Sequence, residues 1–140
     1  MQFRQARAFA VDNRCPYEVA FVDDDTVELS RVDPQGTVLV ASLDLPDGIT
    51  FRVEPGLPTN RDSTPDGLGA AQAVDFNGET TVFFQPDGSA LDPSGDLSNG
   101  VVYFSWAGEL DSCRAVTLFG ATGRIKGWSF NPNEENGRWK

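Results

Sequence analysis

The fold of this chain depends first on residues 17–32, which read YEVAFVDDDTVELSRV. Tyr17, Val19 and Phe21 alternate with their neighbours, so an extended chain turns all three side chains to one side. Three consecutive aspartates interrupt the pattern, and the alternation resumes from residue 26 to residue 32. Two alternating runs around a short polar segment predict an antiparallel β-hairpin.

The rest of the chain up to residue 130 continues as short runs separated by turns. Pro, Gly, Asn and Asp mark turns at residues 33–36, 46–48, 77–78 and 86–89. Between them, strand-like runs cover residues 37–43, 49–53, 73–76, 80–85, 101–106, 115–119 and 124–128. The run 101–106 is apolar on both sides, which predicts a central strand. We expect about eight or nine short strands in all.

Residues 1–13 have helical periodicity instead. One face gathers the apolar side chains Phe3, Ala6, Phe9 and Ala10. The helix is expected to end near Asn13, because Pro16 disfavours helical geometry in the residue before it. No Ser, Thr, Asp or Asn caps its start. Two explanations remain open: the segment is the end of a longer helix, or it is a naturally short helix joined to an added Met.

Together these elements predict one domain, residues 1–140, of the α+β class. The end of an N-terminal helix (1–13) packs on two antiparallel β-sheets formed by residues 17–130, and residues 131–140 follow as a polar tail. A hydrophobic content of 39% that includes 10 Phe is sufficient for a core. No apolar run reaches the roughly 20 residues that a membrane-spanning helix needs.

Charge is unevenly distributed along the chain. The formal net charge is −10, but residues 17–113 alone carry −15, whereas residues 1–16 carry +2 and residues 114–140 carry +3. An acidic body repels nucleic acid and anionic membranes, so only the basic ends could receive such partners. Solubility is the simpler explanation of this distribution.

The absence of histidine limits catalytic and metal chemistry. Neither a Ser-His-Asp nor a Cys-His arrangement can form, and two thiols cannot build a usual structural zinc site. No pair of carboxylates stands out for hydrolysis. The aspartates at 23–25 and the oxygen-rich stretch 92–100 are better explained as a turn and a solvated loop than as calcium sites. We therefore expect no enzyme, no cofactor and no metal.

The two cysteines, Cys15 and Cys113, have two interpretations. In an exported protein they are expected to form a disulfide that closes a loop of about 100 residues and contributes up to ~4.7 kcal/mol in the chain-entropy model. In a cytosolic protein they would be buried free thiols. The sequence leaves both open.

A basic cluster near the C-terminus is the strongest candidate for a binding site. On a strand, Arg124 and Lys126 point to the same face. Arg138 and Lys140 could join them from the tail, and two tryptophans, Trp128 and Trp139, could stack on bases. The alternative is ordinary solvent-facing charge on the outside of a strand.

Several motifs resemble the GspH/FimT family of minor pseudopilins. Residues 82–89 (VFFQPDGS) and 114–125 (RAVTLFGATGRI) are similar to the closing half of that family, in which a strand and turn precede a final hairpin with a Gly-Arg-hydrophobic-basic sequence. Residues 6–10 followed by 17–21 resemble its helix end and first strand, and residues 43–49 (LDLPDGI) resemble one of its turns. The likeness covers nearly the whole chain except residues 54–72 and the tail.

This resemblance implies a function as well as a fold. It implies a hydrophobic N-terminal helix, missing here, that carries the prepilin-peptidase site, anchors the subunit in the bacterial inner membrane and packs in the filament core. The head would be periplasmic or extracellular, where a Cys15–Cys113 bond could form. Its partners would be other major and minor pilins or pseudopilins of a type IV pilus or a type II secretion system, contacted by packing and recognition at the filament tip.

The resemblance also implies an alternative function. Some FimT-like members bind DNA for uptake through a Gly-Arg-x-Arg motif. Gly123, Arg124 and Lys126 match its positions, with Lys in place of the second Arg. The alternative function is therefore DNA binding through this basic patch, with Arg138 and Lys140 as further contacts.

Overall fold

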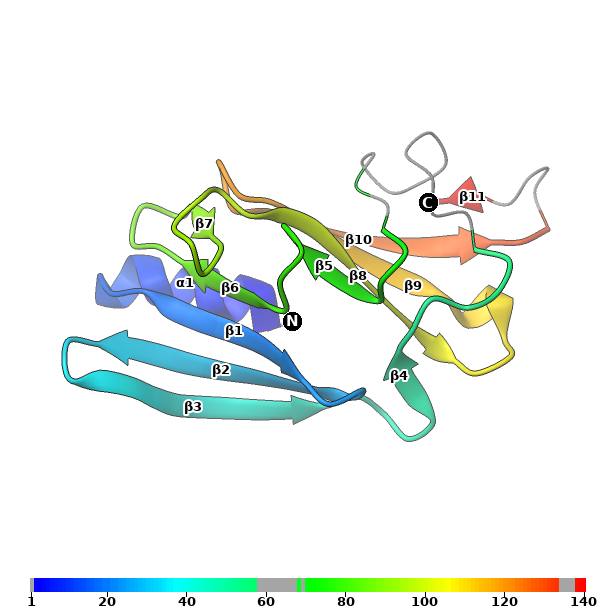
Figure 1. The fold of residues 1–140 in the computed structure, drawn as a ribbon, viewed down its shortest axis with the longest axis horizontal. Coiled ribbons are helices and arrows are strands. Elements are labelled where there is room, and N and C mark those ends of the chain that lie inside the picture. The colour runs from blue at the N-terminus through cyan, green and yellow to red at the C-terminus, as the bar shows by residue number, and fades with distance from the viewer. Residues whose placement is uncertain (1, 58–67, 69, 134–137) are drawn as a thin grey trace.

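In the computed structural model, which describes residues 2–57, 68, 70–133 and 138–140, one α-helix precedes a series of strands (Figure 1). The helix is α1 (Gln2–Asn13). The strands are β1 (Tyr17–Val22), β2 (Thr26–Asp33), β3 (Gly36–Asp44), β4 (Ile49–Phe51), β5 (Val74–Phe76), β6 (Thr81–Phe84), β7 (Ala90–Leu91), β8 (Asn99–Trp106), β9 (Arg114–Phe119), β10 (Arg124–Asn131) and β11 (Arg138–Trp139). A short 3-10 helix, η3 (Leu110–Ser112), joins β8 to β9.

The strands form two antiparallel sheets (Figure 1). The first has the order β3-β2-β1-β6-β7, and the second has the order β11-β10-β9-β8-β4, with β5 also paired to β8. The hairpin predicted from residues 17–32 is confirmed, because β1 pairs with β2 from Tyr17↔Arg31 to Val22↔Thr26. Strand β3 lies at one edge of the first sheet and pairs with β2 through a bulge near Leu29 and Ser30.

The fold class predicted from the sequence, α+β, is wrong. Strand makes up 49% of the structure and helix 11%, so the protein is mostly β, with one short N-terminal helix and two antiparallel sheets. The helical periodicity of residues 1–13 belongs to a single helix of 12 residues. Beyond Pro16 the apolar residues alternate or form short continuous runs, as in strands, and no second α-helix follows among the described residues.

Helix α1 packs through the apolar face expected from its sequence. Its buried side chains are Phe3, Ala6 and Ala10. The Phe3 ring lies 5.6 Å from that of Phe21 and 5.4 Å from that of Phe76, both in edge-on contact. The helix ends before Arg14, which has a left-handed φ of 54°. In the described part of the chain, no helix is long and apolar enough to cross a membrane.

The core consists of two clusters, one on each face of the second sheet. The first lies between the two sheets and α1, and the second lies on the opposite face of the second sheet. Strand β8 contributes to both, since Val102 belongs to the first cluster while Val101 and Tyr103 belong to the second. This confirms the central strand predicted at residues 101–106, because β8 is buried on both faces and pairs with β9 on one side and with β4 and β5 on the other.

The C-terminal segment differs from the polar tail that the sequence suggested. Arg138 and Trp139 form β11, with Trp139 paired to Phe130 of β10. Trp139 is buried, and its ring lies 5.1 Å from Phe130 and 5.7 Å from Tyr103. A large apolar side chain at the end of a polar stretch fills the second cluster. Residues 134–137 lie outside the described residues.

Candidate functional site

An open groove on the surface is lined by three arginines. Arg4 and Arg7 of α1 and Arg124 of β10 line it, together with residues 122–123 of the β9–β10 turn and Ile125. Its volume is about 610 Å³. Arg4 and Arg7 are three residues apart on a helix, so both project toward the same side. The sequence singled out Arg124 but not the two helical arginines, because nothing in the sequence places α1 beside this turn.

Arg7 is fixed at the groove by two turns of the backbone. Its Nε donates to the carbonyl of Gly88 at 3.2 Å, and its Nη2 donates to the carbonyl of Thr122 at 3.3 Å. Gly88 and Gly123 both have positive φ, of 90° and 69°. A Cβ on Gly123 would collide with the Gly88 carbonyl. Two glycines therefore allow the turns to close around the guanidinium.

The charges that α1 brings to the groove have no carboxylate partner in the part of the chain that the structure describes. Among the described residues, neither Arg4 nor Arg7 forms an ion pair with a carboxylate. The partners of Arg7 are neutral carbonyl oxygens, so its positive charge remains. A groove of this kind suits an anion such as a phosphate or carboxylate group.

Lys126 continues the basic surface along β10. Arg124 and Lys126 are both exposed and alternate on the strand, as predicted. The Lys126 Nζ lies 4.0 Å from the centre of the Trp128 ring, a cation–π contact. The Trp128 Nε1 donates to Thr117 Oγ1 at 3.1 Å. Trp128 is therefore held by its neighbours.

The structure separates the four basic residues proposed from the sequence. The Lys140 backbone pairs with Ser129 by hydrogen bonds of 2.8 and 2.9 Å, so Lys140 lies near the far end of β10 from Arg124. Five residues of strand span about 17 Å. Arg138 is likewise paired opposite Asn131. Trp139, proposed to stack on bases, is instead buried. Arg4 and Arg7 lie beside Arg124, where Arg138 and Lys140 were expected from the sequence.

The two cysteines are free thiols in the structure, which is one of the two interpretations that the sequence left open. Cys113 is buried in the second core cluster, whereas Cys15 is half-buried against the first. They lie on different faces of the second sheet. Burial raises the pKa of the Cys113 thiol, which favours its protonated form and makes it a poor nucleophile.

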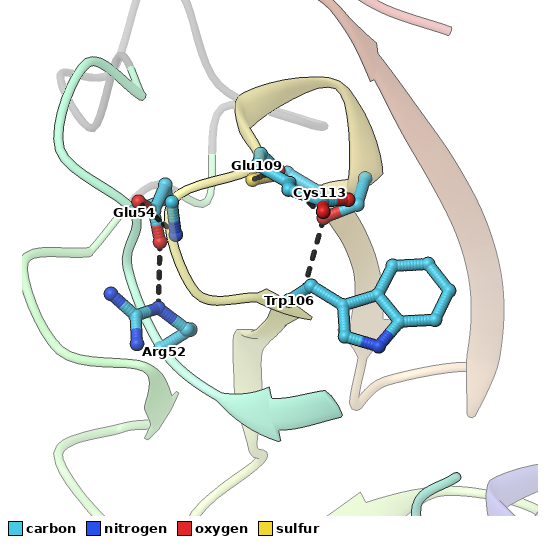
Figure 2. Close-up of polar contacts among 7 residues, drawn as sticks. Arg52, Glu54, Trp106, Glu109 and Cys113 are labelled. Carbon is cyan, nitrogen blue, oxygen red and sulfur yellow. Dashed lines mark hydrogen bonds and ion pairs between the residues drawn. The ribbon is translucent and has the colours of Figure 1, made fainter. Parts of the chain in front are cut away.

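A buried carboxylate near Cys113 did not stand out in the sequence. Figure 2 shows Glu54 beside Arg52, with 2.7 Å between Glu54 Oε2 and Arg52 Nε. The amide of Gly108 donates to Glu54 Oε1 at 2.8 Å. The Gly108 bond joins the segment after β4 to the turn after β8. Glu54 Oε2 and Arg52 Nε are close enough for an ion pair but lack the geometry of a hydrogen bond. The carboxylate is better explained as a structural contact than as a catalytic acid.

The oxygen-rich stretches do not form a metal site in the described part of the chain, where no cluster of three or more potential ligands occurs. Asp92 accepts hydrogen bonds from Asn77 and from the amides of Ser94 and Asp96. The Asn77 bond is the main cause of the lowered pKa of the Asp92 carboxyl. Asp92 therefore serves to close its own loop.

No family model matches this chain, and searches of curated proteins and of solved structures find no significant match. The resemblance to the minor pseudopilins therefore rests on the sequence motifs alone.

Proposed function

We propose that this chain is the head of a minor pilin or pseudopilin subunit that acts by contact with neighbouring subunits at a filament tip. Its motifs resemble the GspH/FimT family across most of the chain. In this proposal the full-length subunit is anchored in the bacterial inner membrane, and its head is periplasmic or extracellular. The filament belongs to a type IV pilus or a type II secretion system.

One observation carries the proposal: an edge strand with exposed apolar side chains. On β3, Val38 is 47% exposed, Leu39 55%, Val40 46% and Leu43 45%. Soluble proteins usually protect an edge strand with Lys, Pro or a covering segment, because an unprotected edge pairs with other chains. Residues 36–43 contain no charged residue and no Pro. A surface of this kind suits contact with another protein.

Helix α1 supports the same interpretation. One face is buried on the sheets, whereas the opposite face is exposed and includes Ala8 and Val11, with Val11 42% exposed. A helix packed on one side only leaves its other side available to a neighbouring subunit.

The test is the substitution Leu39→Lys in the full-length gene of the source organism. We expect the head to fold, because Leu39 is exposed, and filament assembly or filament-dependent secretion to fall several-fold. Leu97→Lys is the matched control, since Leu97 is 48% exposed outside β3. Assembly that is equal in both variants would contradict the proposal. A parent gene that encodes no apolar helix upstream of Phe3 would also contradict the proposal.

A second candidate function, binding of DNA or another polyanion, is favoured by the groove of Arg4, Arg7 and Arg124. The affinity for duplex DNA falls with salt concentration, and each phosphate contact that is lost reduces the magnitude of the slope of log K against log salt by about 0.9. We expect Arg4→Ala with Arg124→Ala to weaken binding and reduce this slope. The control, Arg114→Ala with Lys140→Ala, removes the same charge elsewhere. Equal effects of the two pairs would reject the groove as the site.

A further inference from the structure

An apolar cleft adjoins the exposed edge strand. It has a volume of about 200 Å³ and lies between the two sheets, in the space that α1 does not fill. All of its lining residues are apolar: Phe3, Val19, Phe21, Val27, Leu43, Leu45, Phe51, Val102, Phe104 and Val116. Leu43 links the two features, because it lines the cleft and belongs to β3. Leu45 follows directly after the strand.

The backbone of β3 is available for pairing. Among the described strands it pairs with β2 alone, so its other edge has no strand beside it (Figure 1). The strand is nine residues long, which is long enough for a ladder of several hydrogen bonds. Addition of a strand to such an edge is a common mode of peptide recognition, in which alternate side chains enter pockets on one face.

Acidic residues surround the end of β3 beside the cleft. Thr26 Oγ1 donates to Asp25 at 3.1 Å and to Asp44 at 2.9 Å, which brings the β1–β2 turn to the end of β3. Asp23 and Asp24 lie in the same turn, and the Leu45 amide donates to the Asp25 carbonyl. No ion pair with a basic side chain occurs at these aspartates in the described part of the chain. At the other end of β3, Asp33 is already paired with Arg31.

We propose that β3 and this cleft receive an extended segment of a neighbouring subunit by strand addition. The main chain of the segment continues the first sheet, one apolar side chain enters the cleft beside Leu43, and a Lys or Arg after the apolar run meets the aspartates. This inference deepens the assembly function proposed above and rests on it for the source of the segment.

Charge favours such a basic segment over a second copy of this chain. A second copy carries the same net charge of −10. Its only basic residue on β2 and β3 is Arg31, which is paired with Asp33. Two copies joined at β3 would therefore bring no free cation to either cluster of aspartates.

The experiment uses a synthetic peptide of about nine residues, the length of β3, that alternates valine and threonine and ends in two lysines. Amide NMR of the protein locates the binding site. We expect shifts concentrated on residues 37–45, and binding at least about threefold weaker when glutamates replace the two lysines. Absence of binding, or shifts elsewhere, would overturn the inference. Shifts of the β3 amides with protein concentration alone would assign the edge to a second copy instead.

Variants of the protein separate the contribution of the apolar cleft from that of the aspartates. Leu43→Lys places a charge at the cleft and should weaken peptide binding several-fold, while folding is retained because Leu43 is 45% exposed. Asp23→Asn with Asp24→Asn should abolish the preference for lysine over glutamate. Glu79→Gln with Asp111→Asn removes two exposed acids elsewhere and should leave that preference intact. A preference unaffected by the Asp23 and Asp24 changes would contradict the role of the aspartates.

The outcomes also separate this inference from the proposed function. Peptide binding at β3 with normal filament assembly in Leu39→Lys would support strand addition and reject the assembly role. Failure of the peptide together with defective assembly would reject strand addition alone, since β3 would then contact its neighbour in another way.

Discussion

At the scale of single residues, Gly88 and Gly123 permit close contact between two backbone turns and Arg7 at the basic groove. Gly123 has a φ of 69° and faces the Gly88 carbonyl, so any side chain there meets both backbone strain and a collision. The sequence marks Gly123 as part of a turn between two strands. Its contact with Arg7, which lies more than 100 residues earlier on α1, depends on the tertiary fold.

We expect Gly123→Ala to destabilise the protein by about 1–3 kcal/mol, because alanine is strained at positive φ and one turn must move. Gly127→Ala is the control on the neighbouring strand, since a Cβ at that position would have no other atom within 4 Å. Urea unfolding measures both. Equal effects of the two substitutions would show that the contact with Gly88 is unimportant.

Asp92 is a single residue that gives the protein a pH dependence. Hydrogen bonds, chiefly from Asn77, lower the pKa of its carboxyl from the ordinary value of 3.8. A depressed folded-state pKa contributes stability above the unfolded-state value, and this contribution is lost as pH falls through the folded-state pKa. We expect unfolding free energy to fall below pH 3.8 more steeply in the natural protein than in Asp92→Asn. Parallel curves for the two would contradict this.

Among the elements, α1 is held to the sheets mainly through Phe3, which is buried among the aromatic rings of β1, β5 and β6. We expect Phe3→Ala to cost about 3–5 kcal/mol, as for other buried Phe truncations. Val11→Ala, on the exposed face of the helix, should change stability by less than about 0.5 kcal/mol. Thermal or urea unfolding compares them. A small effect of Phe3→Ala would mean that the helix contributes little to the core.

In the molecule as a whole, the two cysteines belong to separate core clusters. We expect a thiol count under denaturing, non-reducing conditions to find two free thiols, and a reducing agent to leave the unfolding transition unchanged. Their separation by the second sheet is the physical reason. A count of zero would restore the disulfide expected for an exported protein.

Part of the local structure of this protein follows from its sequence alone. The period of two in residues 17–32 and the continuous apolar run from 101 to 104 are enough to assign strands. Pro16 is enough to end the helix, because these signals act within a few residues. The exposure of Arg124 and Lys126 follows from the same alternation. The class was misjudged because one short helical segment was counted as a full layer of the fold.

Which distant segments meet depends on the tertiary structure. It places Arg4 and Arg7 beside Arg124, separates Lys140 from them, buries Trp139 and leaves β3 as an exposed edge. These outcomes depend on the order of strands in the two sheets and on the position of α1 against them. Pairing over long sequence separations is set by the packing of the whole core, which local periodicity does not contain.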